Sequence, residues 1–105
     1  MRKKIKGTKN RPRLFVFMSN KHIYAQMIDD TSNRILTSCC SNSKEIKKNL
    51  KLSLNCKTAS ILGKDIAEKS IYQGIRQVVF DRGNKLYHGK IKAFAEAARE
   101  AGIHF

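Results

Sequence analysis

Residues 80–94, FDRGNKLYHGKIKAF, bring together side chains that could carry out chemistry. Asp81 precedes a glycine turn, and His88 and Lys90 begin a segment with helical spacing. An aspartate and a histidine this close together could form an active site, and the free amide groups at a helix start could bind a phosphate. The same mixture of Tyr87, His88 and positive charge could instead bind RNA. The rest of the sequence has to decide among these three interpretations.

A metal-dependent nuclease would need three or four carboxylates at the ends of strands to hold Mg²⁺. Asp29 and Asp30 follow one predicted strand and Asp81 follows another, but Asp65 faces away on a predicted helix. The first predicted strand, which usually supplies the central ligand, contains no acid, and the whole chain has only 8 acidic residues. We therefore predict no metal site, keep the nuclease as a disfavoured alternative, and interpret Asp81 as orienting Arg82 or capping the turn.

Nucleophilic catalysis and nucleotide binding have weaker support still. His22, His88 and His104 could act as bases, but no nucleophile elbow or cysteine–histidine signature accompanies them. The two glycines of residues 80–94 are six positions apart, and no Gly-Lys-Ser/Thr motif follows. We expect no catalytic residue, no cofactor and no small-molecule substrate, so an enzyme is not predicted. A backbone phosphate of a nucleic acid fits the helix start better than a nucleotide does.

The charge of the chain indicates a polyanionic partner. Lysine and arginine number 22 against 8 acids, a net charge of +14, and such self-repulsion costs stability unless an anion offsets it. Residues 1–13 hold seven positive side chains and no acid. We predict a flexible basic arm over residues 1–12 and a single globular domain over residues 13–105. Nucleic acid is favoured over a membrane surface because the arm is almost free of apolar residues.

Three runs of β-branched and aromatic residues follow the arm. Residues 13–19 and 22–29 are joined by Asn20-Lys21, which suits a tight hairpin because asparagine tolerates positive φ. Residues 34–40 predict a third strand, antiparallel to the second. Residues 41–57 are rich in serine, asparagine and lysine and are predicted to form a loop.

Two helices and one further strand complete the predicted fold. Helical spacing predicts helices over 58–74 and 88–101, after which Ile103 and Phe105 can fold back onto the core. The apolar run 77–80 predicts a strand that a right-handed crossover would place parallel to a neighbour. The predicted fold is α/β with the order β-β-β-α-β-α. Each predicted helix has an apolar stripe along one side, and both helices need the same sheet to bury these stripes. The predicted stripes comprise Ala59, Leu62, Gly63, Ile66, Ala67, Ser70, Ile71 and Gly74 in the first helix, and Ile91, Phe94, Ala95, Ala98 and Ala101 in the second.

The three cysteines do not match a disulfide framework or a zinc site. Cys39 and Cys40 are adjacent, and Cys56 stands alone without a metal-binding spacing. We predict that they are small buried thiols in a reducing compartment.

Two blocks of the sequence closely resemble a known family. RPRLFVFMSNKHIYAQMIDD (11–30) and VVFDRGNKLYHGKIKAFAEAAREAGIHF (78–105) are similar to the two signature blocks of bacterial and plastid large-subunit ribosomal protein L eighteen. The helical segment ILGKDIAEKSIYQGI lies where that family has its own helix. The resemblance implies an α/β sandwich in the central protuberance that binds 5S rRNA and helps attach it to 23S rRNA. The implied partners are these two RNAs and neighbouring large-subunit ribosomal proteins, with no membrane and no small-molecule substrate.

The resemblance also implies which residues bind RNA. They lie in the arm, the hairpin, the second strand and the loop before the last helix. The predicted RNA-binding residues are Arg2, Lys3, Lys4, Lys6, Lys9, Arg11, Arg13, Ser19, Asn20, Lys21, His22, Tyr24, Gln26, Arg82, Tyr87, His88, Gly89 and Lys90.

The sequence departs from the family pattern in two places. The stretch before Arg13 is shorter than the arginine-rich extension of many members, and Met18 stands where arginine is common, so Met18 is not counted as an RNA contact. The lysine, asparagine and isoleucine bias and the short arm favour a plastid ribosome as the location, with the bacterial cytoplasm as the alternative. A general RNA-binding protein or RNA chaperone is the alternative function.

Overall fold

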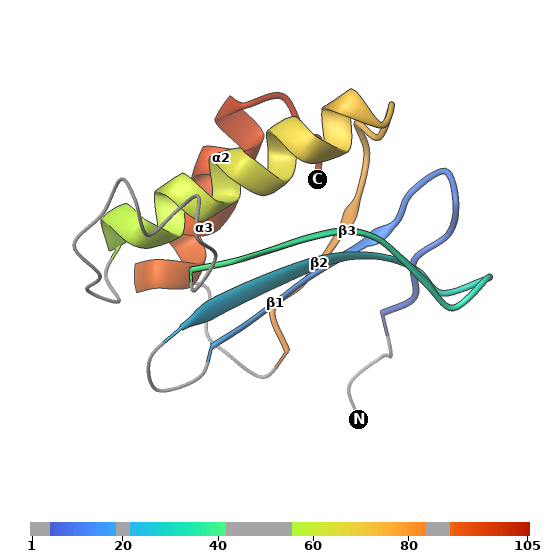
Figure 1. Cartoon of the computed structure of the whole chain (residues 1–105), viewed down its shortest axis with the longest axis horizontal. Helices are drawn as coiled ribbons and strands as arrows, with labels where there is room; N and C mark the ends of the chain where they lie inside the picture. The colour runs from blue at the N-terminus through green and yellow to red at the C-terminus, as the bar shows by residue number, and fades with distance from the viewer. Residues whose placement is uncertain (1–4, 19–21, 42–55, 84–88) are drawn as a thin grey trace.

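The described residues fold into one mixed sheet and two helices. The structure, a computed structural model, describes residues 5–18, 22–41, 56–83 and 89–105. Strands lie side by side in the order β3-β2-β1-β4, with β1 antiparallel to β2 and parallel to β4 (Figure 1). The predicted α/β class, element order and strand directions are confirmed. The elements are β1 Arg13–Met18, β2 Ile23–Asp29, β3 Arg34–Cys40, α2 Cys56–Tyr72, β4 Val79–Asp81 and α3 Gly89–Glu100.

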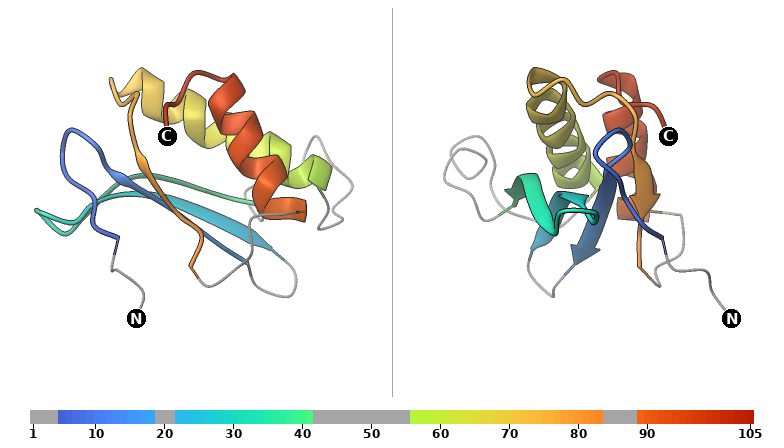
Figure 2. Two further views of the ribbon diagram at one scale, coloured as in Figure 1. Left: turned by 180° about the vertical axis from the view of Figure 1, so that it is seen from behind. Right: turned by 90° about the vertical axis from the view of Figure 1, so that its right-hand side faces the viewer.

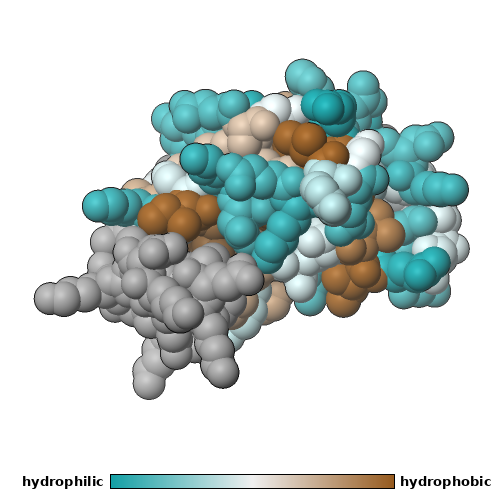
Figure 3. Space-filling view, turned by 45° about the horizontal axis from the view of Figure 1, so that its top comes forward, coloured by the Kyte–Doolittle hydropathy of each residue, from teal (hydrophilic) through white to brown (hydrophobic). Residues whose placement is uncertain are grey.

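Both helices cover the same face of the sheet. Figure 2 shows α2 and α3 side by side in one layer, with the sheet in a second layer beneath them. Along β2, every second side chain from Ile23 to Asp29 is buried and those between are partly exposed. Neither described helix covers the opposite side, which we call the open face. The space-filling view of the helix side is mostly hydrophilic, with separate apolar patches (Figure 3).

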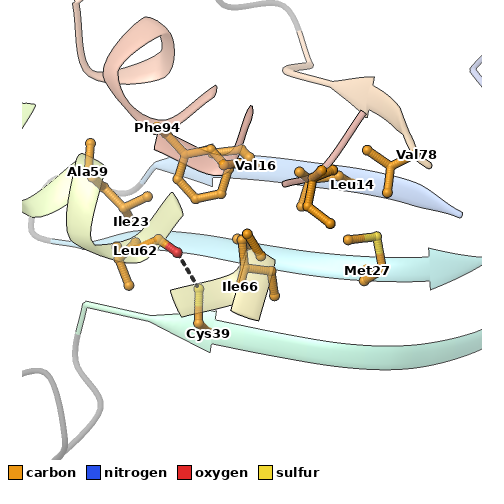
Figure 4. Packing of buried hydrophobic residues seen from close by; sticks show 14 of the residues in the cluster. Leu14, Val16, Ile23, Met27, Cys39, Ala59, Leu62, Ile66, Val78 and Phe94 are labelled. Atoms are coloured by element: carbon orange, nitrogen blue, oxygen red, sulfur yellow. Dashed lines mark hydrogen bonds between the residues drawn. The ribbon is translucent and has the colours of Figure 1, made fainter. Parts of the chain in front are cut away.

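The core fills the space between the two layers. Alternate residues of the strands meet the stripes of the helices, and Phe94 of α3 is completely buried among them (Figure 4). This alternation has the period of two that a strand covered on one face requires. The largest apolar side chains of the core are Phe94, Leu14, Ile23, Met27, Leu62, Ile66, Ile103 and Val16.

The predicted stripe of α2 is nearly right, and its small residues have a clear purpose. A Cβ atom built on Gly63 would lie 2.3 Å from the main-chain oxygen of Phe94 in α3. Glycine therefore lets the two helices pack backbone to backbone on one sheet. Thr58 is also buried, whereas Gly74 is exposed and has φ of +86°, which is the left-handed conformation that ends a helix. Neither described helix is long and apolar enough to cross a membrane.

Strand β4 begins two residues later than predicted. The amide of Val78 donates to the main-chain oxygen of His104 at 3.1 Å, and the amide of His104 donates to Arg76 at 2.7 Å. The stretch before β4 is therefore paired with the end of the chain. As predicted, the end of the chain folds back, because Ile103 is buried and the ring of Phe105 stacks on Phe80 at 5.1 Å.

The cysteine prediction is right for one residue and wrong for another. Cys39 is buried, and its thiol donates to the main-chain oxygen of Leu62 at 3.6 Å (Figure 4). Burial raises the pKa of Cys39 to about 12, so this thiol stays protonated at neutral pH. Cys56 is exposed because it begins α2 beyond the part of the helix that packs on the sheet, and Cys40 is partly buried. Residues 42–55 of the predicted loop lie outside the described residues, and residues 56 and 57 belong to α2.

Substitution Gly63→Ala tests the close contact of the helices. The added methyl group would overlap the backbone of α3, so we expect the free energy of unfolding to fall by roughly 1–3 kcal/mol despite the better helix propensity of alanine. Urea denaturation followed by circular dichroism measures the change. Lys64→Ala, on the exposed side of the same helix, is the control and should stay within about 0.5 kcal/mol of the wild type. A stabilised Gly63→Ala variant would contradict the proposed contact.

Candidate nucleic-acid interface

The side chain of Arg13 ties together three segments at one end of the sheet. Its guanidinium binds Asp30 through Nε at 3.0 Å and Nη2 at 3.1 Å, and it binds Asp81 through Nη1 at 2.9 Å. Asp30 follows β2, and Asp81 is the last residue of β4. Only 21% of the Arg13 side chain is exposed. A planar guanidinium suits this task because its fixed fork of donors can satisfy two carboxylates at once.

Arg13, Asp30 and Asp81 form what we call the Arg13 cluster. The described part of the basic segment, residues 5–12, joins this cluster through Gly7. The amide of Gly7 donates to Asp30 Oδ2 at 2.7 Å, and the Gly7 oxygen accepts from the amide of Asp30 at 3.2 Å. Gly7 is buried, and a Cβ atom there would lie 2.2 Å from the Arg13 nitrogen. These hydrogen bonds, first of all that from Arg13, lower the pKa of Asp30. The division into an arm over 1–12 and a domain over 13–105 stays a prediction.

The carboxylates that a metal site would need already have protein donors. Asp81 Oδ1 accepts from the amide of Gly83 at 2.9 Å, so the predicted capping of the turn is confirmed, while its Oδ2 binds Arg13. Asp29 accepts from the hydroxyl group and amide of Thr31 and from Ser32, and these bonds lower its pKa. Within the described residues, no three His, Cys, Asp or Glu side chains gather as metal ligands. The positive charge between Asp30 and Asp81 disfavours the nuclease hypothesis.

A row of aromatic rings crosses the open face. Phe15 and Phe17 alternate with buried residues along β1, and Tyr24 lies opposite Phe17 on β2. The ring centroids are 5.3 Å apart for Phe15 and Phe17, and 4.8 Å apart for Phe17 and Tyr24. The guanidinium of Arg13 lies 5.5 Å from the Phe15 ring centroid, at one end of the row. Rings presented in this way offer stacking surfaces for bases beside a cation.

Several predicted residues border this aromatic row. Gln26 pairs in register with Phe15, so its side chain shares the open face. The ring of His22 lies edge-on to Tyr24 at 6.3 Å, and its Nδ1 is 3.1 Å from the hydroxyl oxygen of Ser41. The open face therefore brings together predicted residues from two places in the sequence, namely Arg13 of β1 and His22, Tyr24 and Gln26 in and just before β2.

The other predicted residues lie away from the aromatic row or outside the described residues. Lys6, Lys9 and Arg11 belong to the segment tied down by Gly7, Arg82 follows β4, and Gly89 and Lys90 begin α3. No structure is described for the remaining predicted residues, which are Arg2, Lys3, Lys4, Ser19, Asn20, Lys21, Tyr87 and His88.

Sequence reasoning missed two residues of this interface, Phe15 and Phe17. A signal was available, because odd-numbered positions of the strand over 13–19 must face away from the side occupied by Leu14 and Val16. Which side the helices would leave uncovered could not be read from the strand itself.

Comparison with known proteins gives matches over the full chain. Residues 1–105 match the family described as ribosomal L18 of archaea, bacteria, mitochondria and chloroplasts. The chain is 57% identical to the large ribosomal subunit protein uL18c of Gracilaria tenuistipitata var. liui, and all of both chains is covered. It is 54% identical to uL18c of Pyropia yezoensis and 53% identical to uL18 of Trichodesmium erythraeum (strain IMS101). These two matches cover all of this chain and 88% of each relative.

The Asp30→Asn variant tests whether the Arg13 cluster stabilises the fold. The pKa of Asp30 is lowered in the folded protein, so its contribution is complete above its unfolded pKa of about 3.9 and is lost as pH falls through the folded value. We expect the variant to be less stable at pH 7 by roughly 1–3 kcal/mol. The difference should shrink below about pH 4.

Urea denaturation of both proteins between pH 2.5 and pH 7 measures this difference. Glu68→Gln removes one carboxylate from an exposed pair on α2 and should show almost no difference at any pH. If Asp30→Asn were equally destabilised at all pH values, the loss would come from packing and not from the carboxylate charge.

Proposed function

The chain belongs to the family of ribosomal L18 proteins, and we propose that it binds 5S rRNA and helps attach that RNA to 23S rRNA in the central protuberance. Its relatives are named as large ribosomal subunit proteins, and as a member of this family it is a structural protein whose partners are rRNA and other ribosomal proteins. The open face supplies a physical basis for RNA binding that does not depend on the family name.

The stacked row of Phe15, Phe17 and Tyr24 is the observation that carries this proposal. In a sheet whose other face holds the core, three neighbouring aromatic side chains outside the helix layer expose apolar surface without contributing to that core. Unpaired RNA bases can stack on such rings, while Gln26 at the border can contact base edges. Specific binding to a folded RNA follows from the combination of the stacked rings and the polar groups around them.

The basic segment supplies the electrostatic part of binding. Three of its cationic residues, Lys6, Lys9 and Arg11, lie in the described region, and Gly7 fixes the path of the chain between them. Their contacts with phosphates would release counterions, which makes the affinity salt-dependent. Residues 1–12 thus act as the electrostatic anchor, and residues 13–105 form the globular RNA-binding domain.

The ribosome in question is that of a plastid. Three of the similar proteins carry the name uL18c, among them those of Gracilaria tenuistipitata var. liui and Porphyra purpurea. The similarity to uL18 of Trichodesmium erythraeum (strain IMS101) keeps the bacterial ribosome as the alternative location.

Substitution Phe17→Ala tests the aromatic row. Loss of a stacking surface should weaken binding to 5S rRNA by about tenfold, since one stacked base contributes roughly 1–3 kcal/mol. A gel shift with labelled 5S rRNA, with and without Mg²⁺, measures the affinity. Tyr72→Ala at the end of α2 is a matched control because Tyr72 is 93% exposed and lies outside the row. Phe17→Tyr should bind like the wild type, which separates loss of stacking from loss of folding.

Three results of the same gel shift would count against the proposal. Equal affinity for an unrelated RNA of the same length would favour a general RNA chaperone, and Mg²⁺-dependent cleavage of the RNA would favour a nuclease. If six to ten phosphates are contacted, the affinity should fall by about 10³ to 10⁵ between 50 and 200 mM salt. If the affinity did not change with salt concentration, the basic segment would not be part of the RNA interface.

A further inference from the structure

A cavity of about 720 Å³ lies beside the edge strand β4. Its walls come from the basic segment, β4, the end of α3 and the last residues of the chain. A volume of this order is typical of pockets that hold a small molecule or one unit of a polymer. The lining residues that carry the argument are Arg11, Gln77, Phe80, Arg82, Arg99 and Phe105.

The cavity concentrates positive charge from distant parts of the sequence. Arg11, Arg82 and Arg99 all line it, and none of its described lining residues is Asp or Glu. Nη2 of Arg11 donates to the side-chain oxygen of Gln77 at 3.3 Å, and Nε of Arg99 donates to the main-chain oxygen of Phe105 at 3.2 Å. Gln77 and Phe105 thus orient the two guanidinium groups. Such a cluster attracts a phosphate strongly.

Aromatic rings form the apolar part of the same cavity. Phe80 and Phe105 stack on each other at 5.1 Å, and the guanidinium of Arg99 lies over the Phe105 ring at 4.4 Å. Guanidinium planes and aromatic edges beside cations suit a nucleotide, whose base is flat and apolar on its faces and whose phosphate is anionic. A polypeptide strand would need acidic side chains to match the three arginines.

The cavity and the open face lie on opposite sides of β4. Phe80 pairs in register with the core residue Leu14, so its side chain points toward the helix layer, whereas Asp81 pairs in register with Phe15 of the open face. An RNA segment that binds to the aromatic row therefore does not cover the cavity, and a second RNA segment can reach it. The two surfaces meet at the edge of the sheet and at the basic segment, which supplies Arg11 to the cavity.

We propose that this cavity is a second RNA site, which holds a single-stranded nucleotide of an RNA segment other than the one on the open face. The proposal deepens the proposed function, because a protein that joins two RNA molecules needs two separate RNA surfaces. The arginines bind the phosphate, and the wall of Phe80 and Phe105 contacts the base or sugar.

The test uses the full chain bound to 5S rRNA and a fluorescent 12-nucleotide oligouridylate as the probe. We expect fluorescence anisotropy to show that the preformed complex binds the oligonucleotide. Arg99→Gln should weaken this second binding by about tenfold, the typical effect of losing one charge-assisted contact, while affinity for 5S rRNA changes less than about twofold. Arg34→Gln removes the same charge from an exposed position on β3, at the other edge of the sheet, and should have no effect on either binding step.

Folding of the Arg99 variant is checked by its melting temperature and by a second variant. Arg99→Lys keeps the charge and should recover part of the affinity for the oligonucleotide. The proposal is overturned if the complex with 5S rRNA does not bind the oligonucleotide. A polypeptide would then be the favoured partner of the cavity. It is also overturned if Arg99→Gln and Arg34→Gln behave alike, or if Arg99→Gln weakens 5S binding as much as Phe17→Ala does.

Failure of the proposed function can be told apart from failure of this inference. If 5S rRNA proves to bind no better than an unrelated RNA, the same titration is run on the Phe17→Ala chain without 5S rRNA. The double variant, Phe17→Ala with Arg99→Gln, is then compared with Phe17→Ala alone. If only the double variant fails to bind the oligonucleotide, the cavity is an RNA site whether or not the chain binds 5S rRNA specifically. Unchanged binding would overturn the cavity site.

Discussion

The ion pairs of Arg13 are the interaction on which the arrangement of this protein depends. One guanidinium, mostly withdrawn from water, bonds to Asp30 at the end of β2 and to Asp81 at the end of β4. Asp30 in turn holds Gly7 of the basic segment. The two carboxylates would otherwise place negative charge beside a surface proposed to bind RNA. Arg13 therefore joins the chain segments and also offsets part of the negative charge of the two acids nearest the aromatic row.

A second constraint is the narrow spacing of the helices. Gly63 allows α2 to approach the backbone of α3, so that both helices fit on one face of the sheet that the described residues form. All large apolar side chains of the core are then gathered on that face. Neither of the two helices in the described part of the chain covers the opposite face, where the rings lie. Close helix packing and an exposed aromatic surface are thus two results of the same geometry.

The edge strand β4 has a role larger than its three residues indicate. Its pairing with β1 brings Asp81 to Arg13, and the residues just before it pair with the end of the chain at His104. That second pairing places Phe105 against Phe80 and next to Arg99. One short strand therefore separates the open face from a cationic cavity on the helix side.

Local sequence patterns determined the elements of this protein, whereas the tertiary structure decided their functional groupings. The alternation along residues 22–29 and the helical spacing of residues 58–74 predicted the fold, because strand and helix periods are properties of neighbouring residues. The partners of Arg13 lie 17 and 68 residues away, and no local period relates residues so far apart. The same reason explains why the late start of β4 and the exposure of Phe15 and Phe17 were missed. Each depends on strand register and on which face the helices cover, and only the packed chain specifies these.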